Sequence, residues 1–329
     1  MINLKISIIL LIFFLLLFTY TNKFYNIFLF YHFNKGYHPK VIYFDNLWNG
    51  YKYWMAYTPY PKCDAKKENP FIMASNDLIH WRNTKSLKNP LDIPKISDKK
   101  HYNSDTHLLF NNITNSLEVF WRYVNDKDNE VIIYVKNSKN GINWSNKKIF
   151  IKSKNRKKQD YISPSIIFSN GVYRIWYVYN SKLFCFTKKK NKFSNPRMLD
   201  IIFTNRYKIW HIDIIYNEEK KLYELIASAF INWKKRKNMP LFYLSSKDNI
   251  IWTKPIKILD PKEKPFKLFI RGFYRSSLTY YKKKYYLFYS FHNTKKDCGI
   301  GFLSGNNITS IKFNRRKNIF LYKFINSNI

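Results

Sequence analysis

The chain has 329 residues, of which 46% are hydrophobic and 19% aromatic, so it can build a substantial core in one large domain or two ordinary ones. Its formal net charge is +37, but the basic residues are spread along the whole chain and form no single stripe, so no nucleic-acid partner is predicted. The three cysteines lie far apart without CxxC or CxH spacing, which excludes the usual zinc arrangements and a disulfide framework.

The first predicted element is an uncharged apolar stretch at residues 6–22, "ISIILLIFFLLLFTYTN". It fits a signal peptide or a short signal-anchor helix. No small-x-small cleavage site follows, and a second apolar run begins at Phe24, which favours an uncleaved anchor. We therefore expect a signal-anchor or signal-peptide segment at residues 1–30 and a folded domain at residues 31–329. The protein should be membrane-anchored or secreted, with this domain outside the cytoplasm.

A short pattern then recurs: a serine, an Asp or Asn two residues on, and a tryptophan four residues after that. It reads "SNDLIHW" from Ser75, "SKNGINW" from Ser138 and "SKDNIIW" from Ser246, with weaker copies from Thr187 and Ser304. The Asp or Asn can bond the backbone of a tight turn, and the Trp can pack between sheets. We interpret the pattern as a structural hairpin. The aromatic residues that close the copies are Trp81, Trp144, Phe193, Trp252 and Phe313.

Two further strands precede each hairpin, so each unit reads as four strands, and five such units follow the N-terminal segment. Four-stranded units repeated radially are propeller blades. The predicted fold is an all-β, five-bladed β-propeller preceded by an N-terminal hydrophobic helix. The segment Ile319–Phe324 should pair with an early strand and close the ring, because an uncovered edge would invite aggregation.

The first strand of each blade should lie along the central axis, and its starting residues should line the cavity there. When the five strands are aligned on their apolar triplets, one residue per blade falls in a first ring: His38, Asp105, Ser163, His211 and Arg275. Two positions further along, where side chains face the same way, stands a second ring: Lys40, His107, Ser165, Asp213 and Ser277. We expect the first ring to form a binding or catalytic site at the mouth of the cavity.

The long loop at residues 59–70 of the first blade should open on the same face and bring Glu68 to the rim. Trp54, on the strand before this loop, and Trp210, beside His211, are candidates for stacking on a sugar ring. Either could equally belong to the core.

The stretches "HPKVIYF", "NSDTHLLF" and "SPSIIF" resemble the starts of the inner strands in the five-bladed propellers of glycoside hydrolase families 43 and 32, and more loosely the family 130 phosphorylases. The resemblance implies a general base and a general acid on two carboxyl groups. This chain departs from it, with His38 where the base Asp is expected and Ser163 and His211 where an acid Glu is expected. A rebuilt catalytic set would use Asp105 or Asp213 as base and Glu68 as acid.

His38 or His211 could also transfer protons near neutral pH. The remaining predicted substrate contacts are His107, His211, Arg275, Ser163, Trp54 and Trp210.

Three functions fit these residues. The first is a glycosidase-like enzyme acting on a cell-surface or extracellular polysaccharide or oligosaccharide. The second is a phosphorylase or glycosyltransferase, because His38, His211 and Arg275 could hold a phosphate. The third is a glycan-binding module without activity. The pairs Asp105 with His107 and His211 with Asp213 could each present two ligands on one strand face, yet we predict neither a metal nor another cofactor.

Overall fold

The structure is a computed structural model that describes residues 36–203, 207–232, 238–263, 266, 270–293 and 298–310. Its strands form five antiparallel sheets in chain order. The first two sheets contain β1 (Gly36–Trp48), β2 (Tyr51–Pro59) and β3 (Phe71–Ser75), then β4 (His101–Asn111), β5 (Ser116–Asn125), β6 (Glu130–Ser138) and β7 (Lys148–Ser153). The third contains β8 (Ile162–Ser169), β9 (Val172–Tyr179), β10 (Lys182–Lys189), β11 (Lys192–Phe193) and β12 (Arg197–Leu199). The last two contain β13 (Lys208–Asn217), β14 (Leu222–Phe230), β15 (Leu241–Ser246) and β16 (Ile256–Leu259), then β17 (Ile270–Tyr281), β18 (Lys284–Asn293) and β19 (Cys298–Gly305).

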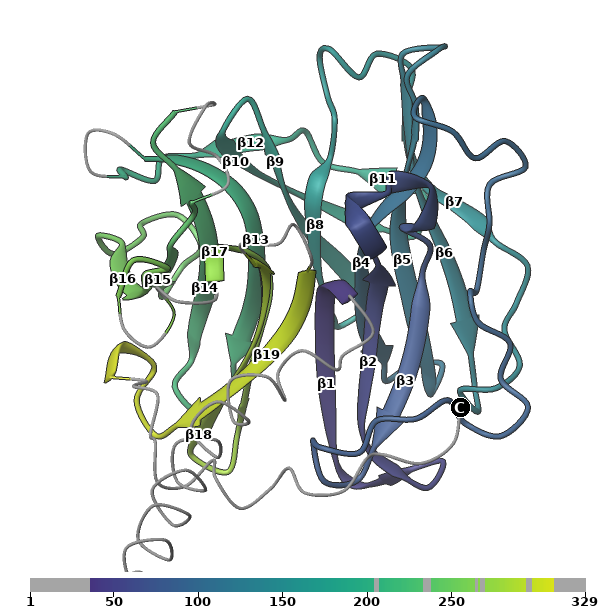
Figure 1. The fold of residues 1–329 in the computed structure, drawn as a ribbon, viewed down its shortest axis with the longest axis horizontal. Helices are drawn as coiled ribbons and strands as arrows, with labels where there is room; N and C mark the ends of the chain where they lie inside the picture. The colour runs from purple at the N-terminus through teal and green to yellow at the C-terminus, as the bar shows by residue number, and fades with distance from the viewer. Residues whose placement is uncertain are drawn as a thin grey trace, which may run out of the picture.

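The five sheets are arranged radially, as the blades of a propeller (Figure 1). The first strand of each blade contacts the first strands of both neighbouring blades, and β1 contacts β17, β18 and β19, so the ring closes between the fifth and first blades. This confirms the predicted all-β, five-bladed propeller. The predicted helix at residues 1–30, the closing segment Ile319–Phe324 and Phe313 lie outside the described residues. No helix in the described part of the chain has the length and hydropathy to cross a bilayer.

The outer strand is less regular than predicted in some of the blades. The second and fourth blades have four full strands, as expected. Within the described residues the fifth has three, and in the first only a bridge between Ala74 and Arg82 stands at the fourth position. In the third blade the outer edge is divided between β11 and β12, which both pair with β10.

The recurring hairpins have the predicted geometry. Asp77 Oδ1 accepts hydrogen bonds from the backbone N–H groups of Ile79 and His80 at 2.9 and 2.8 Å. Asn140 and Asp248 make the same pair of bonds in the second and fourth blades. These contacts fix a turn that contains a residue with positive φ, and they confirm the structural interpretation of the pattern.

A bulge interrupts each of the five inner strands near its start. The register against the second strand shifts at or beside the first-ring residue in every blade. At three of the bulges a residue of the first ring has positive φ: His38 (53°), Asp105 (49°) and Ser163 (54°). Such backbone is unfavourable by about 1–3 kcal/mol for a residue with a Cβ, and it persists where the surroundings impose it. The bulges re-aim the side chains toward the propeller axis.

Candidate active site

Four side chains of the first ring meet at the axis. His38 Nε2 lies 3.5 Å and His211 Nδ1 lies 3.4 Å from the same oxygen, Oδ1 of Asp105. Arg275 Nη1 lies 3.9 Å from that oxygen. All four side chains are at most 4% exposed. Radial repetition therefore brings together residues from four different blades, as the alignment of the inner strands predicted.

The polar atoms that face this centre are not satisfied by the protein. Within the described residues, no hydrogen bond is made by His38 Nε2, either ring nitrogen of His211, Asp105 Oδ1, or the Nε and Nη1 atoms of Arg275. Buried polar groups are nearly always hydrogen-bonded, and a concentration of exceptions calls for a missing partner such as an ion or a ligand. The centre is therefore built to hold something that is not part of the chain.

The spacing of these atoms suits a divalent metal ion. One ligand atom from each of His38, Asp105 and His211 lies within 4.8 Å of the others, and two of the separations are 3.4 and 3.5 Å. Two ligands of a tetrahedral site with metal–ligand bonds of about 2.0–2.1 Å lie about 3.3 Å apart. The sequence pairs Asp105 with His107 and His211 with Asp213 do not form this cluster. It takes one residue from each of three blades instead.

The protonation states favour the same interpretation. Burial lowers the pKa of His38 to about 3, although Asp105 opposes the shift. Burial also lowers the pKa of His211. Burial alone would raise the pKa of Asp105, but the neighbouring His38, His211 and Arg275 outweigh it and hold that pKa below its ordinary value. Two neutral imidazoles and one carboxylate are the forms that bind a metal.

Glu68 reaches the centre from the loop between β2 and β3, as predicted. Two short 3-10 turns (Pro61–Cys63 and Ala65–Lys67) shape this loop, and Asp64 caps the second of them through the N–H of Lys66. Glu68 Oε1 lies 3.5 Å from His38 Nδ1, which also contacts Thr58 Oγ1 at 2.9 Å. Burial, and then the charge of Asp105, raises the pKa of Glu68 well above its usual range. Burial thus favours the protonated form of Glu68.

Arg122 is a buried neighbour of the centre that the sequence analysis missed. Its Nη1 lies 4.0 Å from Asp105 Oδ2, and its Nε donates to the backbone oxygen of Asp160 at 2.8 Å. The Asp160 carboxylate bonds both Arg122 and Arg156, the latter at 2.6 Å. Arg122 lies on the second strand of its blade, where the alignment of inner strands gave no signal. It adds positive charge that keeps Asp105 ionised.

Tyr274 is the second missed residue. Its ring centroid lies 4.0 Å from that of His211, and its hydroxyl accepts a hydrogen bond from Trp210 Nε1 at 3.3 Å. Strand alternation would point Tyr274 away from the cavity, since it directly precedes Arg275. The bulge between Phe273 and Ser276 breaks that alternation. The partly exposed rings of Tyr274 and Trp210 therefore border the centre, and Trp210 stays a candidate sugar contact.

Trp54 belongs to the core. It is fully buried, and its ring lies so close to Gly141, in the hairpin of the second blade, that a Cβ there would come within 2.1 Å of it. Its indole nitrogen donates to the backbone oxygen of Trp48. The core alternative therefore holds for Trp54, because no face of the ring is open to a sugar.

The second ring lies along the same strands and is almost fully bonded. Lys40 Nζ donates to both carboxylate oxygens of Asp213 at 2.7 and 2.8 Å, and Asp213 Oδ2 also accepts the N–H of Leu278 at 2.9 Å. His107 Nε2 lies 2.8 Å from the oxygen of Ile166, to which it donates. These contacts join neighbouring blades, so Asp213 and His107 make structural contacts, and their predicted catalytic and substrate roles stay predictions.

Ser163 belongs to the first ring by position, but its hydroxyl is hydrogen-bonded to the protein, as the side chains of the second ring are. Its hydroxyl accepts the N–H of Ile212 at 2.9 Å and lies 3.0 Å from the oxygen of the same residue. Ser163 therefore links the third and fourth blades, and its predicted substrate contact stays a prediction.

Comparisons with known proteins agree with this architecture. No family model matches the chain. The A type blood N-acetyl-alpha-D-galactosamine deacetylase of Flavonifractor plautii is 31% identical over 109 residues, which are 32% of this chain and only 14% of that protein. The crystal structure of an N-acetylgalactosamine deacetylase from F. plautii, in complex with blood group B trisaccharide, matches with a TM-score of 0.73 at 19% identity over 82% of this chain and 89% of the other. A thermostable family-43 glycoside hydrolase matches with a TM-score of 0.57 at 14% identity over 82% and 89% of the two chains. The chain thus has the five-bladed propeller fold of family 43 structures, as the resemblance predicted.

Proposed function

We propose that the protein is a metal-dependent hydrolase that removes the acetyl group from an N-acetylated amino sugar of a glycan. The observation that carries this proposal is the buried cluster of His38, Asp105 and His211, whose unpartnered atoms have the spacing of metal ligands. The names of two similar proteins support the substrate class, since both the partial sequence match and the structural match with a TM-score of 0.73 are N-acetylgalactosamine deacetylases.

The residues divide the chemistry between them. A divalent cation held by His38, Asp105 and His211 would act as a Lewis acid toward an oxygen beside it. Arg275 keeps N–H groups on Nε and Nη1 without a partner in the described structure, and these can donate to an oxygen of the bound sugar. Its other nitrogen, Nη2, is fixed by the backbone oxygen of Pro164 at 2.6 Å. Arg275 therefore presents a preorganised donor, which is the arrangement that stabilises developing negative charge.

Glu68 supplies the proton transfer. In amide hydrolysis a water oxygen adds to the acetyl carbon, the carbon–nitrogen bond breaks, and the nitrogen leaves with a proton as the free amine. The amine is a poor leaving group unless it is protonated. The raised pKa of Glu68 favours the protonated form of its carboxyl group, so it can serve as the general acid. The products are acetate and the de-N-acetylated sugar.

Glycoside hydrolysis is the second candidate, and one observation favours it. Two carboxyl groups border one centre with their pKa values shifted in opposite directions, Glu68 upward and Asp105 downward. Such a pair is the signature of an acid and a base that work together. In this reaction Asp105 would activate water and Glu68 would protonate the glycosidic oxygen. The deacetylase proposal is preferred because Asp105 could act as a general base without any metal ligand beside it. His38 and His211, however, both turn nitrogens without a hydrogen-bond partner in the described structure toward Asp105, which is the arrangement of a metal site.

One experiment separates these functions. The full chain, loaded with zinc or manganese, is incubated with N-acetylated oligosaccharides, with and without inorganic phosphate. Acetate release that a chelator abolishes and the metal restores is the expected result. New reducing ends without acetate would support the glycosidase instead, and sugar phosphate would support the phosphorylase. Binding without any product would indicate the glycan-binding module.

We also propose that residues 1–30 anchor the protein to a membrane with the propeller on the extracytoplasmic side, where glycans are exposed. The support is the uncharged stretch at residues 6–22. Fractionation of cells that express the full chain should place it in the membrane pellet, and protease added outside intact cells should degrade the propeller. Recovery in the soluble fraction with the N-terminus intact would contradict the anchor.

A further inference from the structure

In the first, second and fourth blades, the tryptophan that closes the hairpin fills the gap between its own blade and the preceding blade. Trp81 of the first blade packs in a cluster with Phe288 and Phe302 of the fifth. Trp144 of the second blade packs against the cluster around Trp54 of the first. Trp252 joins the cluster between the third and fourth blades. An indole at this position therefore seals the outer part of the interface between blades.

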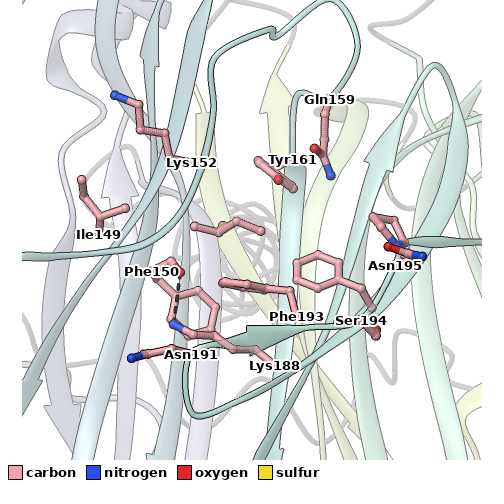
Figure 2. A pocket seen from close by; sticks show the side chains of 13 residues that line it. Ile149, Phe150, Lys152, Gln159, Tyr161, Lys188, Asn191, Phe193, Ser194 and Asn195 are labelled. Atoms are coloured by element: carbon pink, nitrogen blue, oxygen red, sulfur yellow. Dashed lines mark hydrogen bonds between the residues drawn. The ribbon is translucent and has the colours of Figure 1, made fainter.

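The third blade has no indole at this position. Its hairpin reads "TKKKNKF", without the serine, the Asp or Asn, or the tryptophan of the three strong copies, and the closing residue is Phe193. Phe193 is 46% exposed. The outer strand is interrupted at residues 194–196, between β11 and β12. A cleft of about 570 Å³ opens here between β7 of the second blade and the outer edge of the third (Figure 2).

The cleft has the surface of a sugar-binding site. Its lining includes the buried aromatic side chains of Phe150, Tyr161 and Phe186, and the exposed ring of Phe193 lies against Phe186. Amide side chains stand around it, contributed by Gln159, Asn191 and Asn195 (Figure 2). Small-molecule sites have volumes of about 300–1,000 Å³ and combine an apolar lining with a few polar groups that fix orientation. An aromatic face beside several amides can stack on a sugar ring and bond its hydroxyl groups.

The half-buried ammonium group of Lys188 favours a ligand with a negative charge. Lys188 Nζ lies 4.1 Å from the ring centroid of Phe150 and 5.2 Å from that of Phe193, and it donates to the backbone oxygen of Phe150 at 3.2 Å. Within the described residues no ion pair joins Lys188 to a carboxylate, and no residue that lines the cleft is acidic. Burial lowers the pKa of Lys188, although Glu118 opposes the shift. A second amine at the edge, Lys152, is paired with Glu130.

We propose that this cleft binds an acidic sugar unit of a glycan, with the carboxylate or sulfate of the sugar at Lys188 and the sugar ring against Phe193. The site is distinct from the central one, since it is built from the outer strands β7, β10 and β11 and the central site from inner strands and the loop of Glu68. The net charge of +37 draws anionic glycans toward the propeller as a whole. The cleft provides a defined binding site for one acidic sugar unit.

The test is a binding titration of the full chain with a tetrasaccharide that contains glucuronic acid, and with the same tetrasaccharide after reduction of its carboxyl groups. The acidic form should bind about tenfold more tightly, the value expected for one charge-assisted hydrogen bond. Lys188→Gln should remove this preference, whereas Lys182→Gln, at an exposed position on the same strand β10, should keep it. Phe193→Ala should weaken both forms, because each loses the stacking surface.

Two further arms keep the cleft separate from the central site. Glu68→Gln should leave the titration unchanged, and Lys188→Gln and Phe193→Ala should release acetate from a single N-acetylated sugar at the wild-type rate. The proposal is overturned if Lys188→Gln binds the acidic tetrasaccharide like Lys182→Gln. It is also overturned if the reduced form binds equally well, or if Lys188 matters only for binding to vesicles of phosphatidylglycerol. The binding outcomes, unlike the acetate arm, do not depend on whether the protein is a deacetylase.

Discussion

The two rings of side chains on the propeller axis differ sharply although they share the same five strands. Members of the second ring stand two residues after those of the first, and the charged members of both are buried. In the second ring Lys40, Asp213 and His107 are bonded across the blades. In the first ring the facing atoms of His38 and His211 have no partner within the described residues.

The comparison shows that burial and residue type do not distinguish a functional group from a structural one in this fold. Each unsatisfied buried polar group costs about 1–3 kcal/mol of stability. A chain that keeps several of them at one point, on strained backbone, gains something other than stability there. We expect substitutions in the first ring to change activity and substitutions in the second ring to change stability.

The largest effect on activity should come from Asp105→Asn. Loss of the carboxylate removes the negative charge that His38 and His211 surround, so acetate release should fall about 10³-fold, within the range for groups that act directly in the reaction. Asp105→Asn also removes a counter-charge 3.9 Å from the buried Arg275, so thermal unfolding should move to a lower temperature, but the protein should stay folded because the charge of Asp213 still stabilises Arg275. Unchanged turnover would refute the catalytic assignment of the first ring.

The largest effect on stability should come from Asp213→Asn in the second ring. The substitution leaves the ammonium group of Lys40 buried without its counter-charge, which costs about 3–5 kcal/mol. Chemical denaturation measures the loss. The double variant Lys40→Met with Asp213→Asn is the control, and it should recover most of the stability, since no buried charge then lacks a partner. A double variant as unstable as the single one would show that packing, not charge, explains the effect.

A smaller loss of activity should follow Glu68→Gln. The amide keeps the shape of the side chain but has no proton to give, so kcat should fall about 10²-fold with little change in KM. Steady-state kinetics on an N-acetylated sugar measures both. Added formate should restore part of the activity of Glu68→Ala, because a small acid can occupy the vacated space. Chloride at the same concentration should not.

The smallest effect should come from Ser163→Ala, and it sharpens the comparison most. Ser163 stands in the first ring by position, but its hydroxyl is bonded to the backbone of Ile212. We expect a loss of about 1–2 kcal/mol in unfolding free energy and turnover within about twofold of the wild type. A strong loss of activity without loss of stability would place Ser163 in the site after all.

Much of the fold and part of the site could be predicted from the sequence. The hairpin repeat gave the number of blades, because a turn such as that of Asp77 is specified by local hydrogen bonds. The alignment of inner strands brought His38, Asp105, His211 and Arg275 together for a similar reason, since equivalent positions of a radial repeat meet at the axis. The loop of Glu68 was also placed correctly. The predicted four strands were not met in every blade, since outer strands have few neighbours to hold them.

What the sequence by itself determined is therefore everything that a repeat imposes locally: the strands, the turns, the radial order and the list of residues near the axis. Only the tertiary structure decided which of those residues are satisfied. Asp213 is bonded to a residue of the first blade, and Ser163 to a residue of the fourth. Tyr274, which a bulge turns toward the centre, and Arg122 both border the site from positions that the alignment of inner strands did not include. Hydrogen bonding depends on distances of a few tenths of an ångström between atoms far apart in the chain. A repeat pattern predicts which residues are neighbours, but not the distances between their atoms. It therefore cannot tell which buried polar atoms make a hydrogen bond and which do not.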